Sequence, residues 1–114
     1  MLPDRLTWLS GYRLLWMLVM FDLPVVDKKD RRAYQRFRDF LMDEGFARTQ
    51  YSIYMRLLPG KEAVEKYDAL IHRNLPDNGK VQVVVITDKQ YENIRTYEKR
   101  ESKSQKNPRQ LALF

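Results

Sequence analysis

The sequence predicts one α+β domain in which two strand-helix-strand halves build a single antiparallel sheet with both helices on one of its faces. Apolar runs typical of strands alternate with segments whose apolar residues recur at helical spacing. The two helical segments carry their apolar residues at the same relative positions, which indicates a weak internal repeat. A chain of 114 residues can form one hydrophobic core and has no room for a separate catalytic domain.

The first strand and the first helix have clear boundaries. Residues 14–21 are apolar at every position, as in a central strand buried on both faces, and the run stops at Asp22 and Pro24. We expect a helix over residues 28–44, because Asp27 can cap its start and Gly45 follows its last periodic residue.

Residues 46–58 alternate with a period of two, which indicates strand structure. No Gly, Pro or Asn marks a turn inside this segment, so one long strand and a hairpin near residues 50–52 both stay open, with the hairpin favoured. A second helix is expected over residues 61–74, and another buried strand over residues 81–86.

The C-terminal part of the chain has three segments of different composition. Residues 93–97 are predicted to form one more short strand, which could add to the sheet of a partner. A polar, basic stretch follows, typical of a flexible linker, and the last residues are apolar again. We divide the chain into an N-terminal extension (1–10), a domain (11–97), and a linker with an apolar docking peptide (98–114).

Packing both helices on one face leaves the other face of the sheet uncovered. Trp16, Leu18 and Met20, or the residues that alternate with them, would point to that face. A second copy of the chain would cover this apolar patch, so the sequence predicts a homodimer.

Composition limits the function. The net charge of +6 and the pI near 9.7 favour an anionic partner such as nucleic acid or a membrane surface. The absence of cysteine excludes disulfides, zinc-thiolate sites and thiol nucleophiles, and it fits a reducing compartment. The longest apolar run falls far short of the ~20 residues that span a bilayer. We therefore expect a cytoplasmic protein that does not enter the membrane.

Two motifs in a fixed order resemble a known family. They are a strand ending in Met20-Phe21-Asp22-Leu23-Pro24 and, after a basic helix, the stretch Arg48-Thr49-Gln50-Tyr51-Ser52-Ile53-Tyr54. This arrangement resembles the smaller of the two universal CRISPR spacer-acquisition proteins, a family of CRISPR-associated endoribonucleases. The lead-in Gly45-Phe46 and the stretch over residues 86–90 are similar to the version found beside type II systems.

The resemblance implies a ferredoxin-like β-α-β-β-α-β homodimer in which Asp22 of each protomer lies near the interface. There the pair can hold a divalent cation, Mg²⁺ or Mn²⁺, with Asp22 as the catalytic residue of an endonuclease. The family's dimer bridges integrase subunits and binds the double-stranded prespacer DNA. Many relatives have tyrosine at the position of Phe21, and its hydroxyl could help to position substrate or water. The pattern of Arg48, Gln50, Ser52 and Tyr54 is intact.

Asp22 is also a candidate ligand on chemical grounds, because a carboxylate at the end of a buried strand suits a hard cation. One carboxylate is too little for phosphodiester hydrolysis, so further oxygen ligands must come from a second protomer or from the phosphate. Asp88 is a poor second ligand, because its strand should end at the opposite edge of the sheet. The alternative is that Asp22 only shapes the strand-to-helix turn with Pro24.

A DNA-backbone track is the second candidate site. The predicted contacts are basic residues of the first helix and the following strands: Arg31, Arg32, Arg36, Arg48 and Arg56. Such contacts read phosphate rather than sequence, so affinity should fall steeply with salt. The alternative is a solvated, mixed-charge helix face.

Three further features of the sequence bear on function. The peptide with Gln110, Leu111, Leu113 and Phe114 resembles the motif with which bacterial proteins dock on the DNA-polymerase sliding clamp, but packing on its own dimer or on the integrase subunit is favoured. A Ser/His mechanism around Ser52 and His72 lacks an orienting group. A single-stranded RNA-binding module is the remaining alternative, although the expected Gly/aromatic signature is missing.

Overall fold

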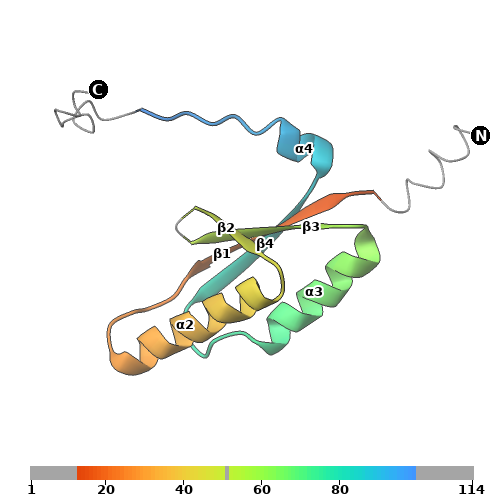
Figure 1. Cartoon of the computed structure of the whole chain (residues 1–114). Helices are drawn as coiled ribbons and strands as arrows, with labels where there is room; N and C mark the ends of the chain where they lie inside the picture. Colours follow the sequence, from red (N-terminus) through yellow and green to blue (C-terminus); the bar gives the residue numbers. More distant parts are fainter. Residues whose placement is uncertain (1–12, 51, 100–114) are drawn as a thin grey trace, which may run out of the picture.

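The computed structural model describes residues 13–50 and 52–99. They form a four-stranded antiparallel sheet of order β2-β3-β1-β4 and three helices (Figure 1). The elements are β1 (Leu15–Asp22), α2 (Lys28–Asp43), β2 (Ala47–Gln50), β3 (Ile53–Leu58), α3 (Lys61–Arg73), β4 (Lys80–Thr87) and α4 (Asp88–Glu92). The predicted α+β, ferredoxin-like fold class is confirmed.

The two long helices cover one face of the sheet, and the short helix α4 lies on the other side (Figure 1). β1 sends Met17, Val19 and Phe21 into the layer between sheet and helices, where all three are buried. Phe37 and Leu41 of α2 belong to the same buried cluster. Fully burying a side chain of this size contributes roughly 1.5–3 kcal/mol, so this layer is the main source of stability.

Both ends of α2 follow the sequence signals. The Asp27 side chain accepts a hydrogen bond from the backbone N–H of Asp30 at 2.8 Å, which satisfies one free donor of the first turn. At the other end Gly45 adopts φ +88°, and the N–H of Phe46 donates to the carbonyl of Leu41 at 2.9 Å. The left-handed glycine lets the chain turn back into the sheet.

The segment that sequence patterns left open forms a hairpin of two strands, β2 and β3. The register shifts between Arg48 and Gln50, which marks a bulge. There the Thr49 hydroxyl donates to the carbonyl of Ile53 at 3.2 Å. The favoured hairpin is confirmed, and a side-chain bond within the bulge accompanies its turn.

The strand predicted over residues 93–97 is wrong for this structure. Residues 88–92 instead form α4, held by a capping box in which Thr87 and Gln90 exchange side-chain and backbone hydrogen bonds of 2.9 and 3.0 Å. The helix directs the following segment away from the sheet (Figure 1), and residues 93–99 pair with none of the described strands. Ile94 and Tyr97 are exposed there.

The predicted N-terminal extension and the C-terminal docking peptide lie outside the described residues. Within residues 13–50 and 52–99, no helix combines the length and hydrophobicity needed to cross a membrane.

Candidate functional site

The face of the sheet opposite α2 and α3 is apolar over three strands. Along β1 the residues on this face are Trp16, Leu18 and Met20, as one of the two predicted sets requires. Their cross-strand neighbours complete what we call the open face: Ile53, Met55 and Leu57 on β3, and Gln82, Val84 and Ile86 on β4. The predicted set Trp16, Leu18 and Met20 does lie on the face away from the two long helices, and α4 covers the Trp16 end of that face.

The strand β3 turns its more polar side toward the helices and its apolar side outward. Tyr54 and Arg56 pair with Val19 and Met17, which belong to the buried face of β1. The apolar alternates of β3 therefore lie on the open face. Apolar residues of a strand normally face the core, so the outward set on β3 is unusual.

Asp22 lies on the open face at the end of β1, directly opposite Lys80 of β4, and both residues are exposed. A shallow hollow of ≈ 200 Å³ adjoins them, lined also by Met20, Ser52 and Ile53 among others. Lys80 offers a cation beside the carboxylate, a neighbour that sequence patterns did not reveal because the two residues are far apart in the chain.

The turn before β4 fixes the backbone at Asp22. Gly79 has φ +100°, and a Cβ at this position would lie 2.9 Å from the Asp22 carbonyl oxygen and 2.5 Å from Leu23 Cδ2. Only glycine fits both the space and the left-handed conformation. The turn before β4 thus packs against the strand end that carries the candidate ligand.

Asp22 has no cluster of further candidate ligands in the part of the chain that the structure describes. Among the described residues no group of three or more His, Cys, Asp or Glu side chains could hold a metal ion. Asp88 follows Thr87, which pairs with Leu15 at the opposite end of β1, and its carboxylate accepts a hydrogen bond from Trp16 Nε1 at 2.8 Å. The expectation that Asp88 lies at the opposite end of the sheet from Asp22, and is a poor second ligand, is confirmed.

Phe21 is among the residues that line the hollow beside Asp22, but its ring points away from it. Its ring lies on the helix side of the sheet, 5.2 Å from the ring centre of Phe37 and 5.6 Å from that of Tyr54. Successive residues of a strand point to opposite faces, so a hydroxyl at position 21 would point into the core, away from Asp22. The implied help in positioning substrate or water does not fit this geometry.

The residues of the second motif divide between surface and core. Arg48 and Gln50 are exposed on β2, the edge strand. Ser52 contributes its carbonyl, which accepts a hydrogen bond from the Phe21 N–H at 3.2 Å. Tyr54 is only 1% exposed, and burial raises the pKa of its hydroxyl. A buried ring cannot stack on a base, so Tyr54 is a packing residue.

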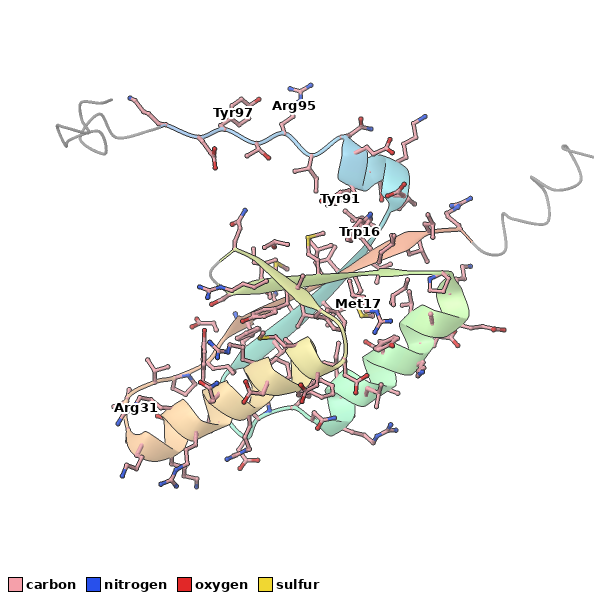
Figure 2. All side chains as sticks on the ribbon, viewed as in Figure 1. Trp16, Met17, Arg31, Tyr91, Arg95 and Tyr97 are labelled. Atoms are coloured by element: carbon pink, nitrogen blue, oxygen red, sulfur yellow. The ribbon has the colours of Figure 1, made fainter. Side chains whose placement is uncertain are left out.

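The predicted basic residues of α2 are all exposed, but they differ in whether they bind other parts of the protein. Arg32 and Arg36 are exposed. Arg31, at the start of α2 (Figure 2), is also exposed, and its Nη1 donates to the Val26 carbonyl at 3.1 Å. Arg31 therefore holds the loop before α2 while keeping other N–H groups toward solvent.

Arg56 differs from the other predicted arginines, because its side chain points into the helix layer. Its Nη1 donates to the carbonyl of Glu44 and to the Tyr67 hydroxyl, the latter at 2.6 Å. Its guanidinium carbon lies 4.6 Å from the centre of the Tyr67 ring. Arg56 joins the end of α2 to α3, so its assignment to a phosphate-binding track is not supported.

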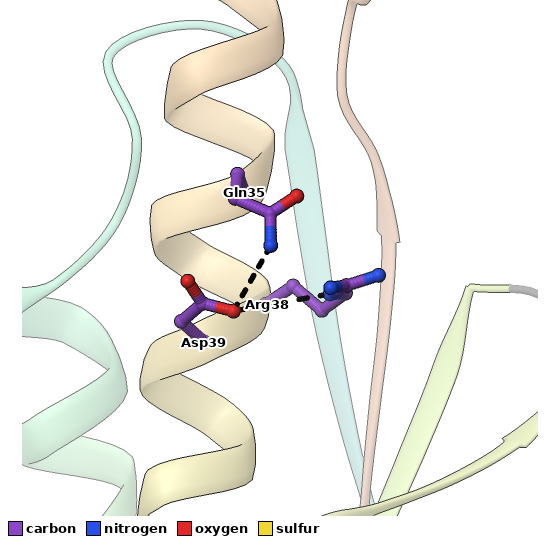
Figure 3. A network of polar contacts seen from close by, with 3 residues as sticks. All are labelled: Gln35, Arg38 and Asp39. Atoms are coloured by element: carbon purple, nitrogen blue, oxygen red, sulfur yellow. Dashed lines mark hydrogen bonds and ion pairs between the residues drawn. The ribbon is translucent and has the colours of Figure 1, made fainter.

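Two other features escaped the sequence analysis. Arg38 extends from α2 toward the strands (Figure 3) instead of joining the outer charged face. Trp16 stacks on Tyr91 of α4 with ring centres 4.2 Å apart, next to the Trp16–Asp88 hydrogen bond (Figure 2). His72 is exposed on α3, as expected for a surface residue.

Comparison with known proteins gives a consistent result. The family model described as CRISPR associated protein Cas2 matches residues 15–94. A CRISPR-associated endoribonuclease Cas2 from Paracidovorax avenae is 43% identical over 93% of this chain and 99% of its own length. The protein of the same name from Flavobacterium psychrophilum is 40% identical over the full length of both chains. A third, from Acidovorax ebreus, is 49% identical over 66% of this chain and 74% of its own length.

Proposed function

The chain belongs to the Cas2 family of CRISPR-associated proteins, and from this membership we propose that it is the cytoplasmic, dimeric, duplex-DNA-binding subunit of a CRISPR spacer-acquisition complex. The observation that carries the proposal is the open face, an apolar surface that ends at the single carboxylate of Asp22.

A second copy of the chain is the occupant that best explains the open face. Leu57 and Val84 are 39% and 40% exposed there. The apolar residues of β3 point away from the long helices, and a second copy would remove them from water. A two-fold axis near the end of β1 would also supply a second Asp22, which one chain lacks. An interface that repeats the same patch on both subunits is the usual arrangement of a dimer.

The charge supports DNA as the ligand of this dimer. Each chain carries a net charge of +6, and Arg32, Arg36 and Arg48 are exposed on α2 and β2. Two copies double both the charge and the length of the basic surface. A duplex supplies the regular row of phosphates that such a surface can contact without reading sequence.

Metal-dependent nuclease activity is the second part of the proposal, because the relatives are named endoribonucleases. Asp22 and the partner subunit's Asp22 would hold Mg²⁺ or Mn²⁺ across the interface. The bound ion would supply activated water for phosphodiester hydrolysis. Lys80 beside Asp22 offers a cation to the phosphate and limits repulsion between the two carboxylates.

The CRISPR integrase subunit is the proposed protein partner. The segment after α4 exposes Ile94 and Tyr97, which are 50% and 83% accessible to solvent. Exposed apolar and aromatic side chains on an extended segment are suited to strand addition on another subunit. The apolar peptide at residues 110–114 is a second proposed contact, with the integrase or the sliding clamp.

A single-stranded RNA-binding module without catalysis remains the alternative function. Such modules stack bases on exposed aromatic rings of the sheet. Tyr54 is in the core, and one face of Trp16 is covered by Tyr91. These contacts favour the DNA-binding proposal over the alternative.

The test is binding of a labelled duplex of about 30 base pairs across a salt series, for the wild type and Asp22→Ala, with and without Mg²⁺. We expect steeply salt-dependent binding by both proteins and Mg²⁺-dependent cleavage by the wild type alone. Binding by both without cleavage would refute the nuclease part. Failure of the wild type to bind the duplex, with tight binding of single-stranded RNA, would establish the alternative.

A further inference from the structure

Three side chains from two elements form a cluster at one end of the open face. Tyr91 of α4 stacks on Trp16 of β1, with ring centres 4.2 Å apart and 23° between the ring planes (Figure 2). Asp88, the first residue of α4, accepts a hydrogen bond from Trp16 Nε1 at 2.8 Å. We call Trp16, Asp88 and Tyr91 the clasp, because they hold a short helix against the sheet.

The backbone places α4 where the clasp can form. The N–H of Asp88 donates to the Leu14 carbonyl at 3.2 Å, which continues the β1–β4 pairing by one step before the chain turns into the helix. The capping box of Thr87 and Gln90 then fixes the first turn of α4. A helix of 5 residues is too short to be stable alone, so α4 depends on its contacts with β1 and β4.

The helix α4 takes up the space that a partner sheet would need. Sheets that pack face to face lie about 10 Å apart, and a helix with its side chains is about 10–12 Å across. A second sheet therefore cannot lie over Trp16 and Tyr91 while α4 is in place. The part of the open face that α4 leaves uncovered lies toward the other end of β1, at Leu18, Met20 and Asp22.

Two-fold symmetry makes this restriction stronger, because both copies of a symmetric dimer use the same patch. A two-fold axis between two stacked sheets can run along the strands or across them. An axis along the strands, or one across them near Trp16, would bring both α4 helices into the same gap of about 10 Å. An axis across the strands near Asp22 sets the two helices at opposite ends of the interface, since Trp16 and Asp22 lie about 20 Å apart along β1.

We propose that the clasp positions the second copy of the chain: it keeps α4 over the Trp16 end of the open face and so confines self-association to the Asp22 end. The inference rests on the proposed dimer and adds what fixes its two-fold axis. The clasp residues are positioning residues, because they act on the interface through α4. This arrangement also brings the two copies of Asp22 toward each other.

Spin labels on single cysteines locate the axis, because the natural chain contains no cysteine that would compete for the label. Lys61 marks the clasp end, since α3 begins shortly after Leu58, the partner of Leu15. Asn78 marks the other end, since it precedes the glycine that packs against the Asp22 carbonyl. Both marker residues are exposed and lie outside the open face, so a label on either leaves the apolar contact intact.

Electron paramagnetic resonance of Lys61→Cys and Asn78→Cys, each in the otherwise unchanged full chain, measures the distance between the two labels of a dimer. An axis near Asp22 predicts that the Lys61 labels lie roughly 30–40 Å farther apart than the Asn78 labels, because a two-fold axis doubles each distance from it. Equal distances, or a shorter distance between the Lys61 labels, would overturn the inference.

The same measurement on clasp variants tests what fixes the axis. Tyr91→Ser removes the stacked ring and Asp88→Ala removes the acceptor of the Trp16 hydrogen bond, and each should add shorter distances between the Lys61 labels. Asp88→Asn keeps an acceptor oxygen and should retain the wild-type distances. Tyr97→Ser is the matched control, because Tyr97 is 83% exposed and lies outside the clasp. Thermal melting checks the fold, and the two clasp variants are independent should one fail to fold.

The outcomes separate this inference from the proposed function. Wild-type distances in folded Tyr91→Ser and Asp88→Ala would overturn the clasp and leave the dimer intact. Loss of the dimer in Tyr91→Ser would also overturn it, because the clasp would then be part of the contact and not its limit. A wild type that shows no coupling between labels at either position, and sediments as a monomer, would overturn the proposed dimer and the clasp together.

Discussion

Arg56 allows the structural role of a basic residue to be separated from a role in DNA binding. Replacing it by methionine keeps the apolar stem and removes two hydrogen bonds and the contact with the Tyr67 ring. Hydrogen bonds from a charged group contribute about 1.5–3 kcal/mol each when buried, and a cation–π contact adds about 0.5–1 kcal/mol. Since Arg56 is half-buried, water replaces part of these interactions, and we expect Arg56→Met to lose about 3 kcal/mol of unfolding free energy.

The assay is urea denaturation followed by circular dichroism, with thermal melting as a second readout. A loss of about 3 kcal/mol corresponds to roughly 12–24 °C in Tm for a domain of this size. Arg36→Met is the matched control, because Arg36 is exposed on α2, and its stability should stay within about 0.5 kcal/mol of the wild type. Equal stability of the two variants would refute the structural role. A stable Arg56→Met that loses one unit of salt slope would instead support the phosphate contact inferred from sequence.

Three further predictions concern the turn, the core and the open face. Gly79→Ala should lower the unfolding free energy by about 1–3 kcal/mol in denaturant titrations, because a Cβ there meets Leu23 and the backbone of Asp22; Asn78→Ala, in the same turn, is the control. The raised pKa of Tyr54 means that the folded state holds this proton more tightly than the unfolded state. Stability should therefore be constant below the ordinary pKa of 10.0 and fall as pH rises through the folded pKa, and Tyr54→Phe should remove this decline in urea titrations. Leu18→Lys puts a charge in the middle of the open face and should weaken self-association at least about tenfold in sedimentation equilibrium, whereas Ala69→Lys on exposed α3 should not.

The sequence predicted those elements whose boundaries carry local signals. The continuous apolar run defined β1, and Asp27 and Gly45 bounded α2. The hairpin stayed undecided because its bulge and turn use Thr49 and its neighbours in place of Gly or Asn. The helix α4 was missed although Thr87 and Gln90 have the spacing of a capping box, because residues 88–92 are mostly polar and carry no apolar period.

The position of Asp22 could be predicted because it depends on one strand, whereas the position of Arg56 depends on how the helices pack on the sheet. Asp22 follows directly from the end of β1, and its exposure on the open face is consistent with a role as a ligand. The position of Arg56 in the helix layer was not foreseen, because alternation separates the two faces of a strand but does not say which face meets the helices. The long stem of Arg56 and the ring of Tyr54 cover the core on the side that looked polar. The position of Lys80 opposite Asp22 required the tertiary structure.

We propose that two copies of this chain join through the open face and bind one DNA duplex. Sedimentation velocity of the full chain, alone and with a labelled duplex of about 30 base pairs at low salt, tests both parts in one experiment. We expect a dimer without DNA and a faster complex with two protomers on each duplex. A chain that sediments as a monomer at every concentration and leaves the duplex unbound would refute this proposal.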